Sequence, residues 1–210
     1  DVFAESTWHE EELKRLSREA GVALLKAFDV RGNEFRPEPT PEIPDPLNEF
    51  EQLVEDVKGH ALTLHLLGSY LRDAHEGDIT QRDHINLSEV VEEQGGHAFR
   101  VLDAYVRALE TGPAEHRKVS ERALAILKLV GLFDRPATVD CLEALWTGEA
   151  IPNLTEPLIG LSQEQRNIAL KRLESAWLIT INRTERRELL SIDSHPLTRE
   201  YFTRQLRGPN

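Results

Sequence analysis

The segment from Trp177 to Phe202, WLITINRTERRELLSIDSHPLTREYF, constrains the fold more than any other part of the chain. Trp177–Asn182 alternates apolar and polar residues, which predicts a half-buried strand, and Leu189–Ile192 predicts a second strand after a polar turn. The run Ser194-His195-Pro196 then starts a helix, because serine or histidine can cap it and proline suits the first turn. The rest of the chain has mainly helical patterns, so we interpret this hairpin as the β-wing of a small helical domain.

Three predicted helices precede this hairpin. They cover Val119–Phe133, Ala137–Trp146 and Gln163–Ala176, and Ser162 caps the last of them. The spacing of the third helix predicts that Ile168, Ala169, Leu173 and Ala176 point inward. Three helices followed by a two-stranded wing is the winged-helix arrangement, a variant of the helix-turn-helix.

The earlier part of the chain predicts a helical bundle. Its helices are expected at Glu10–Phe28, Asn48–Val57, His60–Arg72, Leu87–Gln94 and His97–Leu109. The first has a second possible start that would shorten it to Arg18–Phe28. Arg36–Leu47 carries five prolines and predicts an extended loop, either a plain exposed connection or a ligand for a partner domain.

The predicted fold class is therefore mainly α, with a helical bundle domain followed by a winged-helix domain. The break Thr111-Gly112-Pro113 and a change in charge balance put the boundary between Gly112 and Val119. We assign residues 1–115 to the helical domain and 116–207 to the winged-helix domain. A chain of 210 residues is long enough for two such domains.

Composition excludes several classes of protein. No run approaches the roughly 18 apolar residues of a membrane span, and no signal peptide precedes the first helix, so we expect a cytoplasmic protein. The chain starts at Asp1 and contains no methionine, so we expect it to be a segment of a longer protein. Its single cysteine, Cys141, excludes an internal disulfide, and its apolar neighbours predict a buried thiol.

The sequence offers no catalytic or metal-binding pattern. It contains neither GxxxxGK[ST] nor GxGxxG, and no serine, threonine or cysteine has the setting of a nucleophile. His60 and His65 are predicted on different helix faces and HExxH is absent, so no bound metal is expected. We therefore expect no catalysis by this chain alone.

The winged helix also permits a DNA-binding regulator as an alternative. The recognition helix would offer Arg166, Lys171 and Arg172, and the wing would offer Arg183, Arg186 and Arg187. However, the formal net charge is -12, with about -14 before Arg117 and +2 after it. Because phosphate contacts dominate DNA affinity, this charge makes nucleic acid an unfavoured partner.

Three landmarks resemble one protein family. Gly59-His60-Ala61-Leu62, after a short helix and before a buried one, resembles the GLPLA-type motif of the signal-transduction ATPases with numerous domains (STAND, including the NB-ARC or AP-ATPase group). Leu145-Trp146 continues the match. Ser194-His195-Pro196, with Leu197 and Arg199-Glu200-Tyr201, resembles the Met-His-Asp motif of that family in its bacterial form. Members include plant resistance proteins, apoptosome-forming proteins and bacterial regulators, some with roles in defence.

The resemblance implies a site that this chain completes only in part. In the family an ATP-binding core precedes this region and carries the P-loop and the Mg²⁺-binding acids. The resemblance implies that Gly59, His60 and Ala61 lie against the adenine and ribose and that His195 reaches the β-phosphate of ADP. Bound ADP would hold a closed state, and exchange for ATP would release the winged helix and permit homo-oligomerisation, while a repeat sensor domain would follow downstream.

The implied function is thus a regulatory nucleotide lid and conformational switch, with ADP or ATP as the ligand of the whole protein, itself a slow ATPase. Two positions depart from the family pattern, because Ala61 replaces a proline and Pro196 replaces an aspartate. Other interpretations stay open: Gly59 as a simple corner between helices, His195 as a simple helix cap, and the chain as a scaffold for assembly only.

Overall fold

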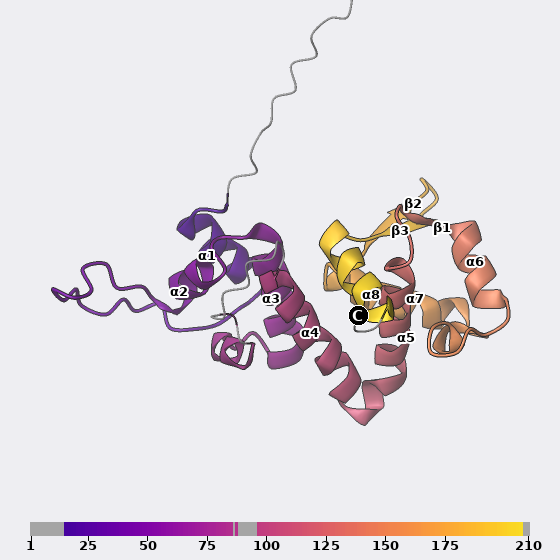
Figure 1. Cartoon of the computed structure of the whole chain (residues 1–210), viewed down its shortest axis with the longest axis horizontal. Helices are drawn as coiled ribbons and strands as arrows, with labels where there is room; N and C mark the ends of the chain where they lie inside the picture. The colour runs from indigo at the N-terminus through magenta and orange to yellow at the C-terminus, as the bar shows by residue number, and fades with distance from the viewer. Residues whose placement is uncertain (1–14, 86, 88–95, 208–210) are drawn as a thin grey trace, which may run out of the picture.

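The computed structural model describes residues 15–85, 87 and 96–207, and their fold is mainly helical with a small antiparallel sheet (Figure 1). The first part contains α1 (Arg18–Ala27), α2 (Glu49–Asp56), α3 (Ala61–His75), the short 3₁₀ helix η1 (Ile79–His84) and α4 (Gly96–Thr111). The second part contains η2 (Ala114–His116), α5 (Arg117–Val130), β1 (Ala137–Thr138), α6 (Val139–Thr147), η3 (Glu156–Leu158), α7 (Gln163–Ser175), β2 (Thr180–Arg183), β3 (Leu189–Asp193) and α8 (Pro196–Arg207). Among the described residues, no helix is long and apolar enough to cross a membrane.

The second part has a winged-helix-like arrangement. In the described residues, β1, β3 and β2 lie side by side in that order, and both pairs are antiparallel. α5 packs against α7 and α8, while β2 and β3 form the wing that follows α7. The predicted class, mainly α with a helical bundle before a winged helix, is therefore confirmed. The predicted division between residues 115 and 116 falls inside η2 and stays a prediction.

Local sequence signals placed several helix starts correctly. Asn48 and Ser162 both form capping boxes, with α2 and α7 respectively. Ser17 accepts a hydrogen bond from the Ala20 backbone at the start of α1, so the shorter of the two predicted first helices is the one that forms. The predicted helix Leu87–Gln94 lies outside the described residues except for Leu87.

Other predictions were wrong. Cys141 is exposed, whereas α6 buries Leu142 and Trp146, which lie one turn apart on another face of the helix. Ile168 is 48% exposed, contrary to the prediction, whereas Ala169, Leu173 and Ala176 are buried as predicted.

The wing and its partner strand also differ from the prediction. Trp177 does not start a strand; its φ is +56°, in a left-handed turn after α7, and β2 begins only at Thr180. Ala137 and Thr138 pair with β3 as a short strand, although the sequence predicted that they begin a helix. A two-residue strand has no periodicity to reveal it.

α3 forms the centre of the first part and α4 connects the two parts. Leu64, Leu67 and Leu71 of α3 are fully buried, as its nearly all-round apolar sequence predicts. A side-chain carbon added at Gly68 would lie 2.7 Å from the ring of Phe28, so this glycine lets α1 and α3 pack closely. α4 contacts α3 as well as α5 and α8, so its packing sets how the two parts meet (Figure 1).

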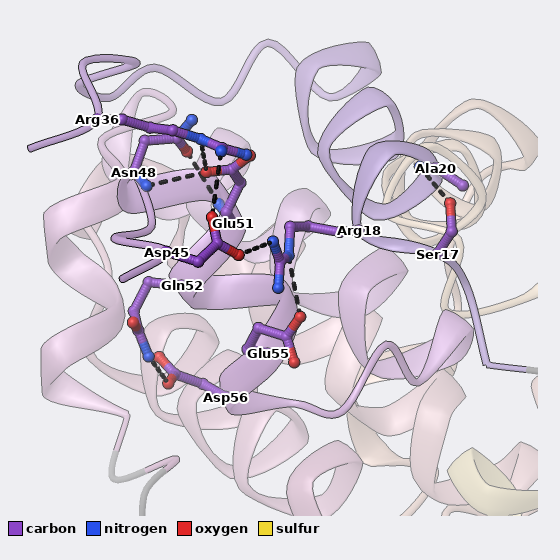
Figure 2. A network of polar contacts seen from close by, with 10 residues as sticks. All are labelled: Ser17, Arg18, Ala20, Arg36, Asp45, Asn48, Glu51, Gln52, Glu55 and Asp56. Atoms are coloured by element: carbon purple, nitrogen blue, oxygen red, sulfur yellow. Dashed lines mark hydrogen bonds and ion pairs between the residues drawn. The ribbon is translucent and has the colours of Figure 1, made fainter. Parts of the chain in front are cut away.

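Ion pairs hold the base of the proline-rich loop against α1 and α2. Arg36 donates to both carboxylate oxygens of Glu51, and Glu51 also accepts from the Asn48 backbone as part of the capping box (Figure 2). Asp45 lies between Arg36 and Arg18, at 3.4 and 3.1 Å. The hydrogen bonds from Arg36 lower the pKa of the Glu51 carboxyl, and the Asn48 backbone adds to this. The loop has no helix or strand, as predicted, but it turns where Thr40 and Ile43 exchange backbone hydrogen bonds. Phe35 and Ile43 are exposed.

This network predicts a defined acid sensitivity. A carboxyl whose pKa is lower in the folded state stabilises the fold above its unfolded pKa, and that stability is lost as the pH falls through the folded pKa. Glu51→Gln keeps the capping-box geometry and removes the charge, so we expect a shallower loss of stability below about pH 4.5. Urea unfolding between pH 3 and 7, measured roughly every half unit, checks this. Glu55→Gln, at the exposed partner of Arg18, is the control, and an equal effect there would contradict the prediction.

Candidate functional site

A cleft of about 900 Å³ lies where the first part of the fold meets the wing. One wall comes from α1 and the first turns of α3, and the other from the approach to β2 and the start of α8. Its lining residues are Leu16, Ala20, Leu24, Ala61, Leu62, His65, Trp177, Leu178, Ile179, Thr180, Asp193, Ser194, His195, Pro196 and Arg199. The volume is within the range of small-molecule sites, and most of the lining is apolar with polar groups at the α8 end.

The cleft brings together parts of the two motifs found in the sequence. Ala61 and His195 line it directly, although 134 positions separate them in the chain. Gly59 and His60 immediately precede Ala61, and His60 lies close enough to His195 to contribute to the lowering of its pKa. The two predicted halves of the site are therefore neighbours in space.

Gly59 fixes the corner between α2 and α3. Its φ is +65°, its N–H donates to Val54, and its carbonyl accepts from the Leu16 backbone at 2.9 Å. A side-chain carbon on Gly59 would lie 2.5 Å from the Leu16 carbonyl oxygen. The interpretation as a helix corner is thus correct in geometry, and the same corner ties the cleft-lining Leu16 to the start of α3.

His60 caps α3. Its Nδ1 accepts from the Thr63 backbone N–H at 3.2 Å and lies 2.9 Å from the Thr63 hydroxyl. Because Nδ1 accepts, the proton of the neutral ring is assigned to Nε2. Burial, and then the nearby Arg15, lower the pKa of His60, so the neutral form is favoured at pH 7.

His195 has the same role at α8. Its Nδ1 accepts from the Leu197 backbone N–H at 3.2 Å, and its carbonyl accepts from Arg199 in the first turn. Burial is the main cause that lowers the pKa of His195, followed by His60 and Arg199. The ring is therefore a cap that also lines the cleft, with its Nε2–H left for another acceptor.

Three side chains in the cleft have buried polar atoms without a hydrogen bond. They are Nε2 of His65, Oγ of Ser194 and Nη1 of Arg199. Buried polar groups in proteins are nearly always hydrogen-bonded, so three unbonded groups in one cleft call for a partner. Sequence reasoning missed all three as site residues. Ser194 and Arg199 belong to the quoted motif, whereas His65 had been considered only as a metal ligand.

An apolar stripe of α1 faces the same cleft. Leu16, just before α1, and Ala20 and Leu24 of α1 line the cleft, while α1 buries Gly21 and Leu25. Leu16 and Leu24 are half-buried and also pack against the core. An apolar wall opposite polar groups suits a ligand that has an aromatic part and a charged part.

Two contacts join the halves of the cleft. The His65 ring lies between Phe28 and Trp177, edge to face, with centroid distances of 4.8 and 4.6 Å. Arg72 of α3 donates to the carbonyl of Ser175 at the end of α7, at 2.8 Å. These contacts hold the first part of the fold against the wing side of the second.

Three of the six residues proposed for DNA binding make contacts within the protein. Arg166 donates to the Leu161 carbonyl and lies over the Trp146 ring. Arg172 donates to Ser120, and Arg183 pairs with Glu174 at 3.0 Å.

Lys171, Arg186 and Arg187 are exposed. A second groove, of about 710 Å³, runs between α6, α7 and the wing. It brings together four of the six residues proposed for DNA binding, Arg166, Lys171, Arg183 and Arg187. The carboxylates of Glu143, Glu174 and Glu188 line the same groove, so its charge is mixed.

In the described part of the chain, no group of three or more His, Cys, Asp or Glu residues could hold a metal ion.

No protein-family model matches the chain, and no curated protein matches it significantly. The case for a function therefore depends on the geometry of the cleft and on the motif resemblance.

Proposed function

We propose that this chain is the nucleotide lid and conformational switch of a STAND-type signalling ATPase. The observation that carries the proposal is the shared cleft, in which the corner before Ala61 and the cap residue His195 meet beside three unbonded polar groups. ADP would lie with its base against the apolar wall of α1 and α3 and its phosphates toward α8. A core upstream, with a P-loop and acidic Mg²⁺ ligands, would supply the rest of the site.

The neutral state of His195 supports this role. Its Nδ1 caps α8, so Nε2–H is the donor available to a phosphate oxygen. The N-terminal turn of α8 adds the positive end of a helix dipole at the same place. Bound ADP would contact both halves of the cleft and so stabilise the closed arrangement relative to one with the wing released.

The departures from the family pattern fit the cleft. Ala61 replaces the proline of the motif, and Leu62 and Leu16 line the cleft beside it, so apolar contact to a base does not require the proline ring. Pro196, in place of the aspartate, occupies the first position of α8, where proline is favoured.

The coding sequence that precedes Asp1 gives the most direct test. The proposal requires a P-loop followed by an acidic Mg²⁺ motif, and an upstream sequence without them would contradict it. The chain alone should show no ATP turnover above background, because it contains no P-loop.

A pair of His195 variants separates the nucleotide role from the cap. In the protein that includes the upstream region, His195→Ala should speed ADP release roughly tenfold or more, as expected for loss of a charge-assisted hydrogen bond. His195→Asn keeps the capping acceptor and removes the Nε2–H donor. Release of fluorescent ADP, measured by stopped flow, checks both variants. Normal ADP retention in His195→Asn would show that His195 acts only as a cap.

We favour the lid over DNA binding because Arg166, Arg172 and Arg183 are engaged within the protein and the whole chain is acidic. A mobility shift of duplex DNA at low salt, lost when Arg183, Arg186 and Arg187 are changed to alanine, would reverse this preference.

A further inference from the structure

We propose that Ser194 and Arg199 form a second phosphate-binding element in the cleft, separate from His195, and that His65 binds the uncharged part of the same ligand. This proposal rests on the proposed function, because it describes which residues of the same cleft bind the phosphates of the nucleotide and which bind its base and sugar. The observation behind it is that each of these three side chains has a buried polar atom without a hydrogen bond.

Ser194 is the best-defined member of the phosphate element. Its residue is 6% exposed, and its Oγ is buried without a hydrogen-bond partner in the wall of the cleft. A buried hydroxyl without a hydrogen-bond partner destabilises the fold, because it has lost its hydrogen bonds to water. A ligand oxygen that accepts a hydrogen bond from this hydroxyl would offset that loss of free energy. Ser194 lies directly before His195 and the first turn of α8.

Arg199 supplies the charge. It lies on α8 one turn after His195, and its side chain is 18% exposed. Its Nη1 is 3.7 Å from Oδ1 of Asp193, which is close enough for an ion pair and too long for a hydrogen bond. The same Oδ1 accepts from the Ser194 backbone N–H at 2.8 Å. Asp193 therefore positions both groups, while the Nη1 proton remains available for a ligand.

His65 suits the uncharged half. Burial, followed by Arg72, lowers the pKa of His65, which favours the neutral ring. It is held edge to face between Phe28 and Trp177, and the apolar stripe of α1 lines the same cleft. A neutral imidazole can donate or accept, so it matches a sugar hydroxyl or a base nitrogen better than a phosphate.

The test measures the two halves of the ligand separately on the 210-residue chain. Pyrophosphate and adenosine are titrated by NMR, with dissociation constants of about millimolar order expected for each half alone. Arg199→Gln and Asp193→Asn break the same ion pair, so a structural role would make their effects similar. We expect Arg199→Gln to weaken pyrophosphate binding roughly tenfold. Asp193→Asn should strengthen it, because a negative charge leaves the site while the Oδ1 acceptor remains.

Ser194 and His65 have matched variants. Ser194→Ala should weaken pyrophosphate binding roughly fivefold. Ser191→Ala, in the preceding strand β3, should leave it unchanged, because the Ser191 hydroxyl accepts a hydrogen bond from Asn182. His65→Phe keeps an aromatic ring between its neighbours and should weaken adenosine binding only.

Three outcomes would overturn the proposal: no saturable pyrophosphate binding, changes in the same direction for Arg199→Gln and Asp193→Asn, or equal effects of Ser194→Ala and Ser191→Ala. The proposed function fails separately, if the sequence before Asp1 lacks a P-loop, and that result would leave the pyrophosphate measurements intact.

Discussion

Gly59→Ala is expected to lower the free energy of unfolding by about 3 kcal/mol. Two causes add together. A non-glycine residue at a φ of +65° is strained, and the new carbon would lie 2.5 Å from the Leu16 carbonyl oxygen. A backbone atom cannot move away as a flexible side chain can, so the hydrogen bond between Leu16 N–H and the Gly59 carbonyl would be disrupted as well.

Gly160→Ala provides the matched control. Gly160 has a φ of +70°, and no atom lies within 4 Å of an added side-chain carbon. Alanine at this position is therefore strained in its backbone but does not clash, and we expect the free energy of unfolding to fall by about 1 kcal/mol. Urea unfolding of both variants at pH 7 gives the comparison. Equal losses would mean that the contact with Leu16 does not constrain the corner.

The corner matters for the cleft because Leu16 lines it. A displaced Leu16 would change the apolar wall next to Ala61 even in a variant that folds. This link explains why a glycine before a helix can belong to a ligand site without a contact to the ligand. The interpretation of Gly59 as a corner and its proposed nucleotide role are therefore compatible.

The parts of the fold that the sequence predicted are those with local causes. Asn48 and Ser162 cap their helices through their own side chains, and the near-continuous apolar pattern of α3 requires burial. These interactions involve residues within one or two turns, so a single sequence contains them.

The predictions that failed depend on distant neighbours. Cys141 and Ile168 lie on helices with apolar residues on more than one side. The packing of α6 against β1 and β3, and of α7 against α5, decides which side is buried. Trp177 adopts a left-handed conformation that its residue type disfavours, and its ring contacts His65 from α3. That contact joins residues 112 positions apart, beyond the reach of local patterns.

The candidate site shows the same division. His195 and the Gly59 corner could be found because their motifs are contiguous, whereas Asp193 became relevant only when its distance to Arg199 was known. His65 has no motif, and its Nε2 can be recognised as unbonded only in the folded protein. Motifs thus locate a site, and the geometry identifies which atoms still need a partner.

Phe202→Ala is expected to lower the free energy of unfolding by about 4 kcal/mol, because it removes a large side chain from a tightly packed region. Phe202 is 2% exposed, and its ring lies edge to face with Tyr201 at 4.9 Å. A side-chain carbon on Gly131, the C-cap residue of α5, would lie 2.6 Å from Phe202 Cβ, so α5 and α8 are in close contact here. Leu206→Ala, at a residue of the same helix that is 37% exposed, should cost only about 1 kcal/mol.

The effect of Phe202→Ala should extend to the cleft, because α8 carries His195 and Arg199 at its start and is positioned by its contacts with α5 and α4. Tyr201 reinforces the second of these contacts by donating to Asp103 of α4 at 2.6 Å. At a temperature where the variant is still folded, we therefore expect weaker pyrophosphate binding than in Leu206→Ala. Unfolding by urea and titration by NMR measure the two effects on the same samples. If Phe202→Ala loses stability and keeps full pyrophosphate affinity, the first turn of α8 is positioned by the wing rather than by the helix core.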